Sequence, residues 1–170
     1  MIDESLTTMT TLTINSSAPA FSLKGLDDKT HTLYKDPALI TALVFFKTTC
    51  PTCRLAWKYI ERLHQGYHKP GLAVWGISQH DAQRSAEFAS NNGSTFPILI
   101  DDDWRVSKKY DPDFVPTVFL IDTTGRIIDR VVSFDKAGLN RVSETIAARL
   151  NVAAETIAPD DDGAPPFRPG

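Results

Sequence analysis

The chain has 170 residues, of which 42% are hydrophobic, and its formal net charge at neutral pH is -3. A chain of this length and composition can bury one sizeable core, so we expect a single folded domain. The weakly acidic balance, with a pI near 5.8, argues against a nucleic-acid binder or a membrane-surface protein, because both need a basic patch.

The N-terminal region is polar at first and then alternating. Residues 1–17 are rich in Thr and Ser without a sustained hydrophobic period, so we expect a flexible extension there. No apolar run in this stretch is long enough for a signal peptide or a membrane span, and we therefore expect a cytoplasmic protein without a membrane anchor. Residues 20–23 and 30–34 alternate on either side of a turn-like segment, which predicts a β-hairpin.

The central part of the chain alternates between strand and helix patterns. Short apolar runs predict strands at residues 40–46, 72–78 and 96–100. Helical spacing and end signals predict helices at residues 51–67, 81–91 and 103–110. This order predicts an α/β fold, in which a central mixed β-sheet is flanked by helices and parallel strands are joined by right-handed crossovers.

The last part of the chain is expected to close the fold. Residues 118–121 and 126–132 predict a hairpin, and residues 136–150 predict an amphipathic helix. Residues 158–170 hold three aspartates and four prolines. We therefore expect residues 18–150 to form the domain and residues 151–170 to form a mostly disordered tail.

The only two cysteines, Cys50 and Cys53, lie where a predicted buried strand ends and a helix begins. Free N–H groups and the helix dipole stabilise an anion at a helix N-terminus, and Pro51 suits the first helical position. Such a setting lowers the pKa of a cysteine from about 8.5 into a range of roughly 3.5–7.5. We predict that Cys50 is the thiolate nucleophile and that Cys53, one helical turn further on, resolves the mixed disulfide.

Four segments together resemble the thioredoxin-like superfamily, and within it the TlpA/ResA and AhpC/TSA-type branch. They are Cys50–Cys53 with the strand before it, Thr95–Pro97 followed by Asp101, Val115–Thr117, and Phe119–Asp122 followed by Gly125. The resemblance covers residues 18–150 and implies a thioredoxin-like fold with an N-terminal β-hairpin extension. It also implies a cis Val115–Pro116 peptide bond, which would expose the Val115 backbone to pair with a substrate chain.

The activity that this resemblance implies is thiol–disulfide exchange. Cys50 and Cys53 would cycle between dithiol and disulfide on protein thiol or disulfide substrates, without a bound cofactor and in exchange with a thiol reductant system. The oxidising or reducing direction stays open. We expect a monomer. The implied substrate-binding residues surround the thiols: Thr49, Pro51, Thr52, Val115 and Pro116.

Three positions depart from the pattern of related families. Thioredoxins carry a tryptophan just before the first cysteine, where this chain has Thr49, and a buried aspartate six residues before it, where this chain has Val44. ResA-like proteins carry a glutamate three residues after the second cysteine, where this chain has Ala56. Cys53 therefore has to lose its proton to water or through Lys47, which is either a residue that tunes the thiols or an ordinary solvated lysine.

A zinc site is the first alternative, because His64 and His68 follow the two cysteines in the order of a Cys2His2 finger. On one continuous helix, however, these histidines begin about 16 Å beyond Cys53, at a rise of about 1.5 Å per residue. Zinc requires its ligands within about 2.3 Å. We therefore expect no metal at the cysteines.

Two further alternatives are a thiol peroxidase and a copper-delivery module. Residues 49–52 resemble the segment around the peroxidatic cysteine of peroxiredoxins. That family has Thr or Ser where this chain has Lys47, and an arginine where this chain has Pro116. Sco-type copper proteins use a Cys-x-x-x-Cys pair and a distant histidine, whereas this pair has one residue fewer between its cysteines and all four histidines lie early in the chain.

Overall fold

Two apolar strands form the middle of the main sheet. The computed structural model describes residues 12–35 and 38–170. In it, β3 (Ile40–Phe46) and β4 (Leu72–Ser78) pair in parallel over their whole length. All but one of the seven residues in each strand are buried, because other elements cover both faces of the sheet.

The five-stranded sheet has the order β5-β4-β3-β6-β7. The strand β5 (Ile98–Ile100) runs parallel to β4, whereas β6 (Thr117–Asp122) and β7 (Ile127–Val132) form an antiparallel hairpin beside β3. Near the N-terminus, β1 (Ser22–Lys24) and β2 (Thr30–Thr32) pair as a separate hairpin. The predicted mixed sheet and N-terminal hairpin are both confirmed.

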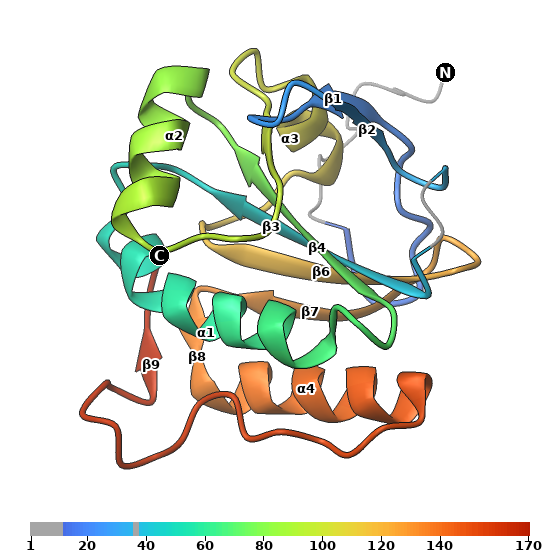
Figure 1. Cartoon of the computed structure of the whole chain (residues 1–170), viewed down its shortest axis with the longest axis vertical. Helices are drawn as coiled ribbons and strands as arrows, with labels where there is room; N and C mark the ends of the chain where they lie inside the picture. Colours follow the sequence, from blue (N-terminus) through green and yellow to red (C-terminus); the bar gives the residue numbers. More distant parts are fainter. Residues whose placement is uncertain (1–11, 36–37) are drawn as a thin grey trace, which may run out of the picture.

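Helices cover the sheet in two layers (Figure 1). On one face lie α1 (Pro51–Tyr67) and α4 (Lys136–Leu150), and α2 (Ala82–Asn91) adds Phe88 to the same core. On the other face, the short helix α3 (Arg105–Tyr110) and the β1–β2 hairpin cover a second core. Because side chains alternate along a strand, Val44 and Phe46 join the first core, whereas Leu43 and Phe45 join the second.

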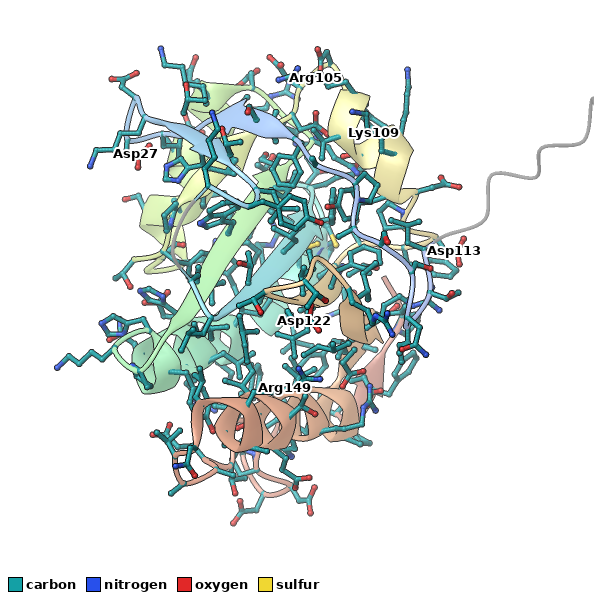
Figure 2. All side chains as sticks on the ribbon, turned by 90° about the vertical axis from the view of Figure 1, so that its right-hand side faces the viewer. Asp27, Arg105, Lys109, Asp113, Asp122 and Arg149 are labelled. Carbon is teal, nitrogen blue, oxygen red and sulfur yellow. The ribbon has the colours of Figure 1, made fainter. Side chains whose placement is uncertain are left out.

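An ion pair links the last helix to the antiparallel hairpin. Arg149 in the last turn of α4 lies 3.7 Å from Asp122, which is the last residue of β6. Figure 2 shows Arg149 on α4 below Asp122 at the sheet. The arginine side chain is half exposed, and pairs of this kind contribute at most about 1 kcal/mol. The pair therefore adds little to the stability of the fold.

The C-terminal residues 151–170 are packed against the domain, so the prediction of a mostly disordered tail is wrong. Ile157 and Ala158 are each only 1% exposed, and the side-chain amide of Asn140 on α4 bonds their backbone N–H groups at 3.1 and 2.8 Å. Further on, β9 (Phe167–Arg168) pairs antiparallel with β8 (Phe134–Asp135). The tail is polar and rich in proline, but α1, β8 and α4 supply partners that its composition does not reveal.

The N-terminal segment that the structure describes also lies against the domain. The backbone N–H of Leu12 donates to Tyr110 and that of Asn15 to Ile127, while Ser17 forms a β-bridge with Arg126. The prediction of a flexible extension is therefore wrong for residues 12–17, and residues 1–11 lie outside the described residues. Within the part of the chain that is described, no helix has the length and hydropathy needed to cross a membrane.

Candidate active site

The thiol pair sits at the junction of β3 and α1. Cys50 is the N-cap of α1, and its Sγ atom accepts a hydrogen bond from the backbone N–H of Cys53 at 3.1 Å. Pro51 occupies the first helical turn, where a missing N–H is tolerated. Both cysteines are free thiols; Cys50 is half-buried and Cys53 is buried. The predicted helix start is confirmed, and it places one thiol at the surface and the other beneath it.

The two thiols have opposite pKa shifts. The hydrogen bond from the Cys53 thiol, assisted by the N–H groups of Cys53 and Thr52 and by the charge of Arg54, lowers the pKa of Cys50 to about 6 despite its partial burial. Burial, and then the hydrogen bond with Cys50, raises the pKa of Cys53 far above its usual range. At neutral pH the pair therefore consists of a Cys50 thiolate and a protonated Cys53.

A loop before β6 forms the other wall of the site. The Val115–Pro116 peptide bond is cis, as the resemblance implies. The Sγ atom of Cys50 lies 3.5 Å from the carbonyl oxygen of Val115. Thr117, which begins β6, is paired with Phe45 near the end of β3, and this register carries the loop to the same edge of the sheet as the cysteines.

The remaining predicted site residues lie in different environments. Thr49 and Pro51 are exposed beside Cys50. Thr52 is 4% exposed, and its hydroxyl donates to the carbonyl of Pro169 at 2.7 Å. The Nζ atom of Lys47 lies 4.8 Å from the centre of the Trp104 ring. Its charge acts to lower the pKa of Cys53, against the effect of burial, so Lys47 is close enough to influence the resolving thiol.

The surroundings of Cys53 are apolar. Val44 and Ala56, which replace the acids of related families, are buried in the same core cluster as Cys53. Among the described groups that shift the pKa of Cys53, none is a carboxylate. His64 and His68 stack on each other, with ring centres 4.8 Å apart. Within the described residues, no group of three or more His, Cys, Asp or Glu could hold a metal ion.

Sequence reasoning missed two polar side chains beside the site. His80 accepts or donates a hydrogen bond at 2.6 Å between its Nδ1 atom and the hydroxyl of Thr48, and so steadies the loop before Cys50. Gln79 is 5% exposed and lines, together with Lys47 and Val115, a cavity of about 350 Å³. Both residues directly follow β4. The rule that sites lie beyond the carboxyl ends of adjacent parallel strands could have indicated them.

The chain is similar to known proteins over most of its length. A sequence model of the AhpC/TSA family matches residues 14–130. The thiol-disulfide oxidoreductase ResA of Geobacillus thermodenitrificans is 32% identical over 122 residues, which cover 71% of this chain and 70% of that protein.

Two solved structures show the same fold. A Chlorobium tepidum protein described as thiol:disulfide interchange protein DsbE has a TM-score of 0.75 and 23% identity, covering 82% of this chain and 99% of its own. The thioredoxin domain of a Bacteroides vulgatus thiol-disulfide oxidoreductase has a TM-score of 0.72 and 19% identity, and the match covers 80% of this chain and 99% of that domain's chain. The arrangement of sheet and helices around Cys50 is therefore that of the thioredoxin-like fold.

Proposed function

This chain belongs to the AhpC/TSA family, and we propose that it is a thiol–disulfide oxidoreductase acting on protein substrates, like the ResA protein to which it is similar. One observation carries the proposal. A half-buried thiol with a pKa of about 6 lies directly above a buried thiol whose pKa is raised, at a helix N-terminus. This is the arrangement that separates an attacking thiolate from a resolving thiol.

In the reducing direction, the reaction proceeds in two exchanges. The Cys50 thiolate attacks one sulfur of the substrate disulfide; that S–S bond breaks, and the other substrate sulfur leaves as a thiolate. The sulfur of Cys53 then gives up its proton and attacks Cys50 in the mixed disulfide, which releases the second substrate sulfur. Two electrons pass from the dithiol to the substrate, and a thiol reductant restores Cys50 and Cys53. The opposite direction uses the same steps in reverse.

The second exchange requires Cys53 to ionise in an apolar setting. Formation of the mixed disulfide removes the negative charge of Cys50, which is one of the influences that raise the pKa of Cys53. The positive charge of Lys47 remains and favours the Cys53 thiolate. We therefore assign Lys47 the role of assisting this ionisation, in place of the buried acid of related families.

Reduction of insulin by dithiothreitol tests the proposed activity. The wild-type protein should accelerate it, Cys50→Ser should abolish the acceleration, and Cys53→Ser should accumulate the mixed disulfide. No acceleration by a reduced, folded wild-type protein would contradict the proposal. Consumption of peroxide at about 10⁴ M⁻¹s⁻¹, which is ordinary enzymatic efficiency, would favour the peroxidase alternative.

Equilibration in glutathione buffers would give the redox potential, and with it the direction. The thiol reductant, the monomeric state and the cytoplasmic location stay predictions from the sequence.

A further inference from the structure

The end of the described chain reaches the thiol site. The carbonyl of Pro169 accepts the 2.7 Å hydrogen bond from the hydroxyl of Thr52, in the first turn of α1. The backbone N–H of Gly170 donates to the hydroxyl of Ser133 at 3.0 Å. In Figure 1, β9 lies beside β8, and the C-terminus that follows it lies near the start of α1. Residues far apart in the sequence therefore meet next to Cys50.

Gly170 lies directly against the loop that carries the cis proline. A Cβ atom added to Gly170 would be 2.0 Å from the carbonyl oxygen of Val115 and 3.3 Å from its nitrogen. The same carbonyl oxygen lies 3.5 Å from the Sγ atom of Cys50. Gly170 therefore covers the backbone of Val115, which is the group that we expect to pair with a substrate chain.

The segment that approaches the site is extended, and its backbone is hydrogen-bonded to the domain. Its two strand residues pair with β8, Arg168 opposite Phe134 and Phe167 opposite Asp135. The carbonyl of Pro166 accepts from the backbone N–H of Lys136 at 3.0 Å. Proline fixes φ near −65° and lowers the entropy that an extended segment loses on docking. Residues 166–170 thus lie on the domain as an extended peptide would.

A stronger contact holds the tail further back. The Nζ atom of Lys136, whose side chain is 3% exposed, lies 2.5 Å from Asp162 and also donates to the carbonyl of Pro159 at 2.7 Å. The hydroxyl of Tyr59 on α1 donates to Asp162 as well. By contrast, every residue from 165 to 170 is exposed. The anchor at Asp162 can therefore stay in place while the last residues detach, because exposed segments with few apolar contacts open at low free-energy cost.

We propose that residues 166–170 are an intramolecular competitor for the substrate-binding surface beside Cys50. A protein substrate has to displace them before an extended segment of its own can lie along Thr52 and Val115. The proposal rests on the proposed function, since it concerns occupancy of the same site. It also defines the partner: an extended polypeptide that offers a carbonyl to Thr52 and a residue with little side chain opposite Val115.

The test is Gly170→Val in the full chain, because its Cβ cannot fit against the Val115 carbonyl. A site that is free in about one molecule in ten binds about tenfold more weakly than a free one. On that basis, release of the segment should raise kcat/KM for insulin reduction by up to about tenfold. The control is Ala154→Val, which adds bulk to an exposed tail residue before the anchor and should leave kcat/KM unchanged.

Hydrogen–deuterium exchange of residues 164–170 shows whether the segment has been released. Faster exchange in Gly170→Val together with a higher kcat/KM supports the proposal. Faster exchange with an unchanged kcat/KM overturns it. Unchanged exchange overturns it too, because the contact with Val115 would then not exist.

A second readout does not depend on catalysis. Cys50 should react with a bulky peptide-linked maleimide several-fold faster in Gly170→Val than in the wild type, whereas the rate with iodoacetamide should be the same in both. If insulin is not reduced by either protein but the maleimide rates differ in this way, the proposed function fails and the competitor stands. If insulin is reduced and the maleimide rates are equal, the competitor fails and the function stands.

Discussion

The Sγ atom of Cys50 lies 3.5 Å from the carbonyl oxygen of Val115, 65 positions further along the chain. A Cys50 thiol can donate a hydrogen bond to this oxygen, but a thiolate cannot. Because the pKa of Cys50 is lowered to about 6, this hydrogen bond is largely lost at neutral pH. At neutral pH the anion is held by the Cys53 thiol and by the N–H groups at the start of α1, and the Val115 carbonyl is left to other partners.

The rate at which Cys50 is alkylated should therefore increase with pH to a plateau, with a midpoint near pH 6. One pH unit below that midpoint, the rate should be about one tenth of its plateau value. Cys53→Ala should move the midpoint upward, because the hydrogen bond from the Cys53 thiol is the largest influence lowering the pKa of Cys50. Arg54→Gln, the matched comparison, should move it upward by less. Measurement of iodoacetamide rates across the pH range decides this, and an unmoved midpoint in Cys53→Ala would contradict it.

Cys53 should resist labelling in the folded, reduced protein, because its side chain is 0% exposed and burial raises its pKa. A brief treatment with iodoacetamide at neutral pH, followed by peptide mapping, should find the adduct on Cys50 alone. In denaturant both cysteines should react. Labelling of Cys53 before Cys50 in the folded protein would reverse the roles assigned to them.

Lys47→Gln should slow resolution of the mixed disulfide, because it removes a positive charge that lowers the pKa of Cys53. A pKa change of one unit alters the thiolate fraction about tenfold, so we expect a fall in the resolution rate of up to that size. The alkylation midpoint of Cys50 should not change. Lys69→Gln, which removes an exposed charge beyond the far end of α1, is the control, and an equal effect of both substitutions would exclude a specific role for Lys47.

Asp162→Asn should lower the Tm of the protein, because it leaves the buried ammonium of Lys136 without its anionic partner. Asp161→Asn removes the same charge from an exposed neighbour and should change the Tm much less. The hydrogen bonds from Lys136 and Tyr59 lower the pKa of Asp162. Its stabilising contribution is therefore present above the ordinary carboxyl pKa of about 4 and is lost as the pH falls below it.

Thermal unfolding of the two variants at neutral and acid pH would check this dependence. The difference in Tm between the wild type and Asp162→Asn should narrow at the lowest pH at which the protein is folded. A difference that is the same at every pH would show that the carboxylate charge is not what stabilises the tail.

The elements that carry the thiols could be predicted from the sequence because their signals are local. An apolar run predicts β3, and helical spacing after Pro51 predicts α1 with the observed ends. Where local signals are weaker, the predicted ends moved: the strand expected at residues 96–100 is reduced to Ile98–Ile100. The position of Cys50 at the helix start follows from the same local pattern, and so does the expectation that it ionises readily.

Only the tertiary structure decided what lies on the site. The tail has the composition of a disordered segment, yet Asn140 and Lys136 on α4 form hydrogen bonds with it. The hydroxyl of Thr52 donates a hydrogen bond to Pro169, which lies 117 positions further along the sequence. Helix and strand signals depend on the spacing of residues that are close in the sequence, so the sequence alone determined the helices and strands that carry the thiols. The docking of residues 151–170 depends on donors and a buried charge brought into place by the folding of the rest of the chain, so no local pattern could predict it.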